Sequence, residues 1–262
     1  MPIIIAPTVT KLPPGSAGAV LVTGSHGGVY PGQLAVLAGV RAVIFHDAGI
    51  GKEDAGVASL PLLQGLGIAA AAVSHWSARV GDAEDMMARG VISRANAAAV
   101  GVLPGMTCAE AAERLHAAVL RRARLDGAEE RRSVVPGRRA LVLIDSASMV
   151  DPVADRGAVV VTGSHGGLVG GDPARALAVD AFAAAYNDAG IGIEQAGIAR
   201  LPALQARGIA AITVAADSAR IGEARSTLED GKISAVNAAA AALGAVVGEP
   251  ARAVLLAWTR HA

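Results

Sequence analysis

The chain has very few aromatic residues and a single cysteine. Phenylalanine, tryptophan and tyrosine together make up 2% of its 262 residues, so rings on which nucleobases or sugars stack are scarce. Cys108, as the lone cysteine, excludes an intrachain disulfide and a multi-cysteine metal site. Basic and acidic residues balance at 23 each, whereas nucleic-acid binding needs a basic surface. We therefore expect no nucleic-acid partner.

Long uninterrupted apolar runs are also missing. Hydrophobic residues make up 53% of the chain, but runs such as "AAAAALGAVVG" from Ala238 contain glycine and are too short to cross a bilayer. The opening "MPIIIAPTVTK" lacks the basic segment and long apolar stretch of a secretory signal. We expect a cytoplasmic protein with no membrane partner. The many alanines suit close helix contacts, and contacts between subunits in a homo-oligomer are an open alternative.

The sequence contains a long internal repeat. "AVLVTGSHGG" from Ala19 matches "AVVVTGSHGG" from Ala158 at nine of ten positions. "HDAGIGKEDAGVASLPLLQGLGIAAAAVSHWSARVG" from His46 matches "NDAGIGIEQAGIARLPALQARGIAAITVAADSARIG" from Asn187 at 22 of 36 positions. "GVISRAN" and "GKISAVN" form a third matching pair. Gene duplication explains these matches, and we predict a first repeat at 1–130 and a second at 131–262.

Short apolar runs alternate with segments of helical character in each copy. Continuous apolar strands separated by helices indicate a mostly parallel sheet that is covered on both faces. The predicted fold is α/β, with two tandem duplicated, mostly parallel βαβ units about a pseudo-twofold axis, as two lobes or one fused sheet. Helices are expected after each "GSHGG" and in the closing segments "ISRANAAAVGVL" and "ISAVNAAAAALG". Ser93 and Ser234 are expected near the N-termini of the two closing helices.

Polar residues with catalytic chemistry follow the predicted strands. In open α/β sheets, ligands bind at the carboxyl ends of the strands. In the first copy these places are occupied by Ser25, His26, His46, Asp47, His75 and Ser77. In the second copy they are occupied by Ser164, His165, Asp188 and Ser218. The sequence therefore predicts a ligand site at this edge in each copy.

The phrase "TGSHGG" carries the most specific chemistry of these strand ends. Gly24, Gly27 and Gly28 leave backbone N–H groups open to a carboxylate, a phosphate or a developing oxyanion. Ser25 is a candidate nucleophile or donor, and His26 is a candidate general base or metal ligand. Asp47, His46 and His75 complete the predicted catalytic set. A tight turn in which serine caps a helix is the structural alternative.

Arginine and asparagine extend the predicted substrate-binding set. Arg79 and Arg220 follow the last strand of each copy, where a guanidinium suits bidentate capture of an anion. A salt bridge to Asp47 or Asp188 is the alternative. Asn96 and Asn237 lie in Ala-rich segments in which asparagine is a poor helix former, so each is expected to contact a ligand or a loop carbonyl.

These residues predict an enzyme that acts on a small anionic or amide-bearing metabolite, with hydrolysis of an amide, lactam or ester bond as the narrower hypothesis. No organic cofactor is predicted, because phosphate-binding and dinucleotide-binding glycine motifs are missing. A divalent-metal enzyme using His26, His46 and His75 is one alternative. A proton-transfer isomerase or lyase and a non-catalytic module that binds anionic metabolites are two more.

The plan of repeated units that offer serine and arginine to a central site is similar to that of the ring-opening amidohydrolases of the cyanuric acid and barbiturate type. This chain has two units where that family has three. Its lysines, Lys11, Lys52 and Lys232, do not match between the copies, whereas that family pairs serine with lysine. The resemblance is one of plan, and membership is not inferred.

Overall fold

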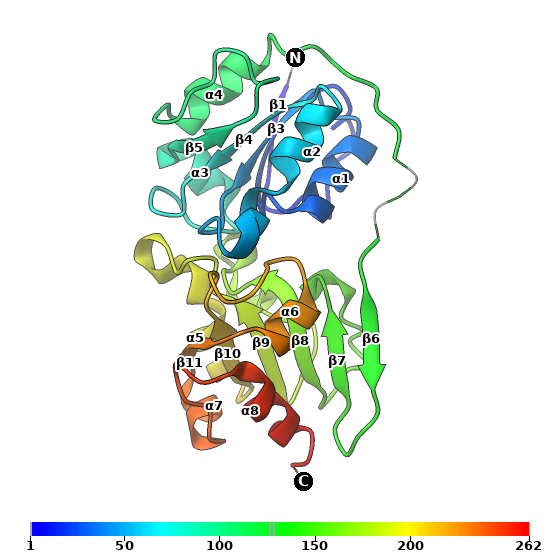
Figure 1. Ribbon diagram of the computed structural model, residues 1–262, viewed down its shortest axis with the longest axis vertical. Coiled ribbons are helices and arrows are strands. Elements are labelled where there is room, and N and C mark those ends of the chain that lie inside the picture. Colours follow the sequence, from blue (N-terminus) through cyan, green and yellow to red (C-terminus); the bar gives the residue numbers. More distant parts are fainter. Residues whose placement is uncertain (1, 126, 128, 262) are drawn as a thin grey trace.

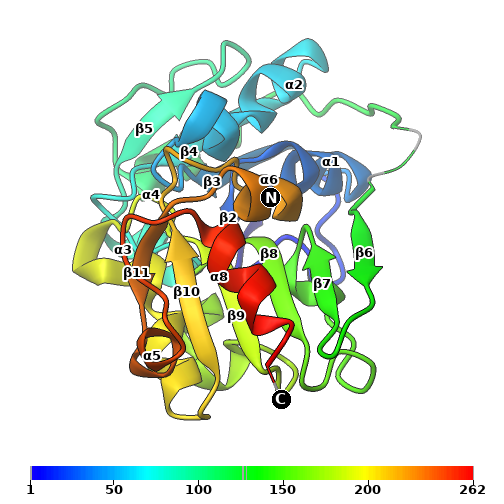
Figure 2. The same cartoon turned by 60° about the horizontal axis from the view of Figure 1, so that its bottom comes forward.

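The computed structural model describes residues 2–125, 127 and 129–261 and shows two α/β lobes, one above the other (Figure 1). Each lobe has its own sheet, of five and six strands, with helices on both faces. Figure 2 shows the second sheet as a separate layer beneath the first lobe. The predicted α/β fold with two mostly parallel βαβ units is therefore confirmed, as two lobes and not as one fused sheet.

The first lobe is built on four parallel strands and one antiparallel edge strand, in the order β1-β2-β3-β4-β5. The strands are β1 (Ile3–Ala6), β2 (Val20–His26), β3 (Ala42–His46), β4 (Ala69–Val73) and β5 (Ile92–Ala95). Every residue of β2, β3 and β4 is buried, which explains why these segments read as continuous apolar runs.

Helices cover both faces of this sheet. On one face, α1 (Val29–Leu37) and α2 (Ser59–Gly65) pack over alternate strand residues such as Leu21 and Phe45. On the other face, α3 (Ala83–Arg89) and α4 (Cys108–Leu115) pack over the intervening ones. Thr107 caps α4 in a capping box with Glu110, and the Cys108 thiol is buried.

The second lobe repeats this plan with one more edge strand. Its order is β11-β10-β9-β8-β7-β6, in which β7 to β10 are parallel and both edge strands are antiparallel. The strands are β6 (Arg132–Val135), β7 (Leu141–Ile144), β8 (Val159–His165), β9 (Ala183–Asn187), β10 (Ala210–Val214) and β11 (Ile233–Val236). One face carries α5 (Arg200–Gln205), and the other carries α6 (Ala224–Glu229), α7 (Ala238–Ala242) and α8 (Ala251–Trp258).

Three of the four helical predictions were wrong in whole or in part, and the closing helix of the second copy is confirmed only over α7 (Ala238–Ala242). The segments that contain Ser93 and Ser234 are the edge strands β5 and β11, which pair antiparallel with β4 and β10. Alanine gave these short segments a helical appearance, but pairing with an open sheet edge decides their conformation. The helix expected after the second "GSHGG" is replaced by two 3₁₀ turns, η3 (Val169–Gly171) and η4 (Pro173–Arg175).

A size difference between equivalent residues accompanies that replacement. In the first lobe α1 packs so closely against α2 that a Cβ on Gly32 would lie 2.5 Å from Ser59 Cβ. In the second lobe Arg200 stands at the position of Ser59 and is 3% exposed. Its guanidinium donates to the carbonyls of Gly167 and Ala176. The buried side chain of Arg200 thus fills the space where two helices pack in the first lobe. In the second lobe it holds the 168–178 loop in place.

The two lobes meet through the loops that follow their parallel strands. Gly49 and Gly190 are in contact, and a Cβ on Gly49 would lie 2.7 Å from Gly190 Cα. The amide of Lys52 donates to Ala216 O, and the equivalent amide of Ile193 donates to His75 O. A small apolar cluster fills the interface between these loops, formed by Ala48, Ala55, Val80, Ala189 and Ile221. The lobes are therefore interlocked about a pseudo-twofold axis.

These interface loops also adopt a left-handed backbone. Ala48, Gly49, Ile50 and Gly51 all have positive φ, and the equivalent residues 189–192 repeat the pattern. Non-glycine residues in this region cost about 1–2 kcal/mol each, so the contact between the lobes maintains them. Among the described residues, we find no helix with the length and apolar character that crossing a membrane requires.

Candidate functional site

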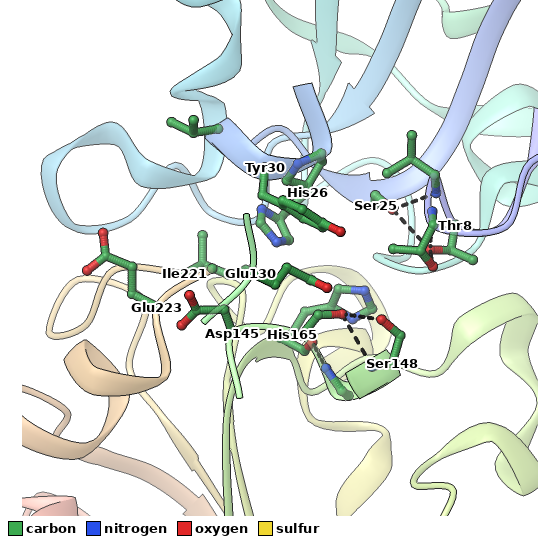
Figure 3. Close-up of a pocket in the computed structure, with 18 of the residues that line it drawn as sticks. Thr8, Ser25, His26, Tyr30, Glu130, Asp145, Ser148, His165, Ile221 and Glu223 are labelled. Atoms are coloured by element: carbon green, nitrogen blue, oxygen red, sulfur yellow. Dashed lines mark hydrogen bonds between the residues drawn. The ribbon is translucent and has the colours of Figure 1, made fainter. Parts of the chain in front are cut away.

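A cavity of about 860 Å³ lies between the two lobes and is the candidate site. Both copies contribute to it, since Ser25 and His26 of the first lobe and Ser164 and His165 of the second all line it. Figure 3 shows Ser25 and His26 on the upper side of the cavity and His165 on the lower side. The two predicted strand-end sites are thus parts of one shared cavity.

The two serines occupy equivalent environments. Ser25 Oγ accepts a hydrogen bond from the Val9 amide at 3.0 Å, and Ser164 Oγ accepts one from the Ala147 amide at 2.9 Å. Ser25 Oγ also lies 3.5 Å from Thr8 Oγ1 (Figure 3). Neither serine is hydrogen-bonded to a histidine, so neither has the adjacent base that activates a nucleophilic hydroxyl. Each hydroxyl fastens the loop after the neighbouring strand and keeps a proton to donate.

His26 is held as a neutral hydrogen-bond donor. Its Nδ1 accepts from the Gly28 amide at 3.1 Å, which places the ring proton of the neutral form on Nε2. Burial, with a smaller contribution from the charge of His46, lowers the pKa of His26 to about 4. Nε2 has no hydrogen-bond partner in the described chain and is not enclosed, so its N–H is available to a ligand.

His165 and His46 are also neutral; His165 is as buried as His26, and His46 is more enclosed. Burial lowers the pKa of His165 well below its ordinary value, and the charge of Arg200 acts in the same direction. His165 Nδ1 is buried and lies near the Gly167 amide without a hydrogen bond of normal geometry. His46 Nδ1 accepts from the Ala48 amide and Nε2 faces Ala78 O at 3.0 Å. Both nitrogens of His46 are therefore occupied by the backbone.

A carboxylate and a phenol face the cavity near His26. The hydroxyl of Tyr30 and the carboxylate of Glu130 lie near each other at the cavity (Figure 3). Burial, followed by the charge of Glu130, raises the pKa of Tyr30 to about 12. Burial and the nearby charge of Asp145 raise the pKa of Glu130, and its Oε1 is buried without a partner. Asp145 itself accepts from the Arg131 and Ala224 amides.

Asp47 and His75 form a pair elsewhere in the interface. Asp47 Oδ1 lies 2.9 Å from His75 Nδ1 and also accepts from the amides of His75 and Gly49. Neither residue lines the cavity. Burial favours the neutral form of Asp47, yet the hydrogen bond from His75 and the charges of His46 and His75 leave its pKa lowered. Asp188 has Ala216 where Asp47 has His75, and burial raises its pKa.

The glycines of the repeated phrase are close to other backbone segments. A Cβ on Gly24 would lie 2.5 Å from the backbone of Gly81, and one on Gly27 would lie 2.9 Å from Gly56 O. A Cβ on Gly28 would lie 2.7 Å from His26 Nδ1. These glycines are therefore needed for packing and for the His26 hydrogen bond, and none of them lines the cavity.

The predicted arginines and serines of "SARVG" and "SARIG" hold the structure together. Arg79 pairs with Glu194 at 3.2 Å and Arg220 pairs with Glu53 at 2.7 Å, so equivalent ion pairs join the lobes in both directions. Each arginine also pairs within its own lobe, Arg79 with Asp82 and Asp85 and Arg220 with Glu223, and neither pairs with Asp47 or Asp188. Of the two arginines only Arg220 lines the cavity. Ser77 and Ser218 are hydrogen-bonded to backbone groups of their own lobes.

Asn96 and Asn237 contact loop carbonyls. Asn96 accepts from the Ala70 and Ala99 amides and donates to Leu60 O and Ile68 O. Asn237 makes the equivalent bonds in the second lobe. Both side chains are buried and fully engaged, so no group remains for a ligand.

His26, His46 and His75 do not meet as a ligand set. Within the described part of the chain, no group of three or more histidine, cysteine, aspartate or glutamate side chains is placed to hold a metal ion. His46 has no free lone pair, and His75 Nδ1 faces Asp47. The metal alternative on these three residues therefore has no geometric support.

Several cavity residues were not identified from the sequence as site residues. They are Thr8, Glu130, Asp145, Ser148, Arg175 and Arg200. Glu130 lies at the boundary between the two predicted repeats, and Arg200 replaces a serine within an otherwise matching block. The arginine at position 200, opposite Ser59 in the first copy, is a difference in charge that the sequence alignment of the two copies already contains.

No protein-family model, curated protein or solved structure matches this chain.

Proposed function

We propose that the protein is an enzyme that hydrolyses an amide, lactam or ester bond of a small metabolite held in the cavity between the lobes. The observation that carries this proposal is the placement of a neutral imidazole N–H, on His26, and a carboxylate of raised pKa, on Glu130, in the same cavity. One group suits a developing oxyanion and the other suits proton transfer.

The proposed reaction divides these roles between the two groups. His26 Nε2–H donates to the substrate carbonyl oxygen and stabilises the negative charge that develops there. Glu130 takes a proton from a water molecule, whose oxygen attacks the carbonyl carbon. The bond from carbon to nitrogen or oxygen then breaks, and the protonated Glu130 returns its proton to the leaving group. Ser25 donates a hydrogen bond and is not the nucleophile, since no base contacts it.

The interlocked lobes support a cavity that is formed before the substrate arrives. The glycine contact, the reciprocal amide bonds and the small apolar cluster join the lobes across the pseudo-twofold axis. Groups that are already oriented need no reorganisation when charge develops.

A proton-transfer isomerase or lyase is the second candidate, and the neutral state of His26 is the observation that favours it. A neutral imidazole that donates to a carbonyl, together with a carboxylate base, is a known arrangement for removing a proton next to that carbonyl. In that reaction Glu130 would take the proton from carbon and not from water.

A panel of small amides, lactams and esters, with proton release read by a pH indicator, tests the hydrolase. With a substrate found, Glu130→Gln should lower kcat about 100-fold or more, and His26→Asn about as much, because each removes one of the proposed groups. Glu249→Gln, on the exposed surface, is the matched control. Unchanged kcat in Glu130→Gln would exclude the proposed base. Deuterium uptake at carbon from D₂O without bond cleavage would instead support proton transfer.

A further inference from the structure

The charged residues that line the cavity are not all paired. Asp145 is paired with Arg131, and Arg220 is paired with Glu53 and Glu223. The remaining charged side chains of the lining are Lys11, Arg175 and Arg200 on the basic side and Glu129 and Glu130 on the acidic side. None of the three cations forms an ion pair within the described chain. The lining as a whole is balanced, with five basic and five acidic side chains, and its unpaired groups are three cations and two carboxylates.

Two of the three unpaired cations, Arg175 and Arg200, lie on the second-lobe wall. Arg175 lies on the 168–178 loop, its side chain is exposed, and its guanidinium lies near Gly170. The corresponding wall of the first lobe is α1, whose sequence "VYPGQLAVL" contains no charged residue. Both arginines of the wall, Arg175 and Arg200, thus have uncharged counterparts in the first copy.

Arg200 is a buried cation without a carboxylate partner. Its guanidinium is bonded to backbone carbonyls and lies 4.9 Å over the Tyr186 ring. Burial lowers the pKa of Arg200, and the charge of Arg175 adds to that effect. A buried charge costs free energy that carbonyl dipoles offset only in part, so an anion placed in the cavity would be attracted by it.

Hydroxyl groups of the second lobe line the same cavity as these cations. Ser164 Oγ accepts from the Ala147 amide, and its own proton has no acceptor in the described chain. Ser148, on the short 3₁₀ helix η2 (Ala147–Met149), also lines the cavity (Figure 3). A guanidinium together with hydroxyl donors is a common set of partners for an anionic oxygen group.

We propose that the substrate carries a carboxylate or phosphate group, and that this group binds at the second-lobe wall, to Arg175 and Ser164, in the field of Arg200. This proposal names the substrate class of the same cavity and rests on the proposed function for its catalytic context. The first lobe then supplies His26 for the reacting carbonyl, so the duplicated halves divide binding and chemistry between them.

Calorimetric titration of the full chain with succinate and with inorganic phosphate, at ionic strength held constant with NaCl, tests the proposal. One of the two anions should bind at a single site, and the one that binds identifies the group as carboxylate or phosphate. Arg175→Gln should raise its Kd about tenfold or more. Arg138→Gln removes the same charge from an exposed position outside the cavity and should leave Kd unchanged.

The outcomes separate this proposal from the proposed function. Absence of saturable binding of either anion, or equal Kd values for Arg175→Gln and Arg138→Gln, would overturn the anion site. Ser164→Ala gives a second variant, with an expected weakening of several-fold. Glu130→Gln should lose turnover and retain anion binding. Anion binding that depends on Arg175 supports the site even when no substrate is hydrolysed, whereas hydrolysis with an unchanged KM in Arg175→Gln refutes it.

Discussion

Replacing His26 with asparagine should remove a part of the protein's stability that depends on pH. His26 is buried and neutral, and burial lowers its pKa to about 4, whereas an unfolded histidine has a pKa near 6.5. Between these two values the unfolded state binds a proton that the folded state does not. Acidification through this window therefore destabilises the fold, and stability is regained as the pH rises. Asparagine keeps an acceptor for the Gly28 amide and does not titrate.

The size of the effect follows from the two pKa values. At pH 4.5 an unfolded histidine is about 99% protonated, whereas His26 is about 25% protonated. The resulting difference in the free energy of unfolding between pH 7.5 and pH 4.5 is about 2.5 kcal/mol. His46 and His165, whose pKa values are also lowered, act in the same direction but are present in both proteins and cancel in the comparison.

Urea unfolding of the wild type and of His26→Asn at the two pH values measures this difference. The variant should lose about 2.5 kcal/mol less than the wild type on acidification, whatever its stability at pH 7.5. His261→Asn, at an exposed position, should follow the wild type. NMR titration of the His26 ring gives the folded-state pKa directly. A midpoint near 6.5, or the same acid sensitivity in His26→Asn and the wild type, would refute the reasoning about burial.

Two further predictions concern the interface between the lobes. Gly49→Ala should lower the free energy of unfolding by more than about 2 kcal/mol, because the new Cβ would meet the backbone of Gly190 and φ is positive at residue 49. Thermal unfolding measures this change. The control is Gly65→Ala, whose Cβ would meet nothing within 4 Å and which should not lose stability. Glu194→Gln removes the ion-pair partner of Arg79 and Arg89 and should lower Tm only slightly. Because exposed ion pairs are screened by salt, about 1 M NaCl should abolish the difference in Tm. A large loss of Tm that persists in salt would contradict this prediction.

The sheets could be predicted from the sequence because their strands are buried on both faces. These strands contain short apolar runs such as "VLV" and "AVIF", and the repeat supplied a counterpart of each. The edge strands β5 and β11 could not be recognised in this way, since they are short and only partly buried and are followed by alanine-rich sequence. Their conformation depends on a partner strand that is distant in sequence, and no local pattern encodes that partner.

The candidate site was predictable only in part, for a similar reason. The strand-end rule correctly placed Ser25, His26, Ser164 and His165 at the carboxyl ends of strands, and the fold brings all four to one cavity. The rule gives no information on how two lobes meet. Because the "DAGIG" loops lie nearest the pseudo-twofold axis, their polar residues and glycines are used in contacts between the lobes.

The differences between the copies are more informative about function than the matches. Matching residues such as Asn96 and Asn237, or Arg79 and Arg220, make equivalent structural contacts, which duplication preserves in both lobes. Arg200 breaks the symmetry: it replaces a serine, displaces a helix from the cavity wall and leaves a loop that carries Arg175. A symmetric cavity would present the same groups to both ends of a ligand. An asymmetric one can bind one end and react with the other, and our two proposals together assign these tasks to the second and first lobes.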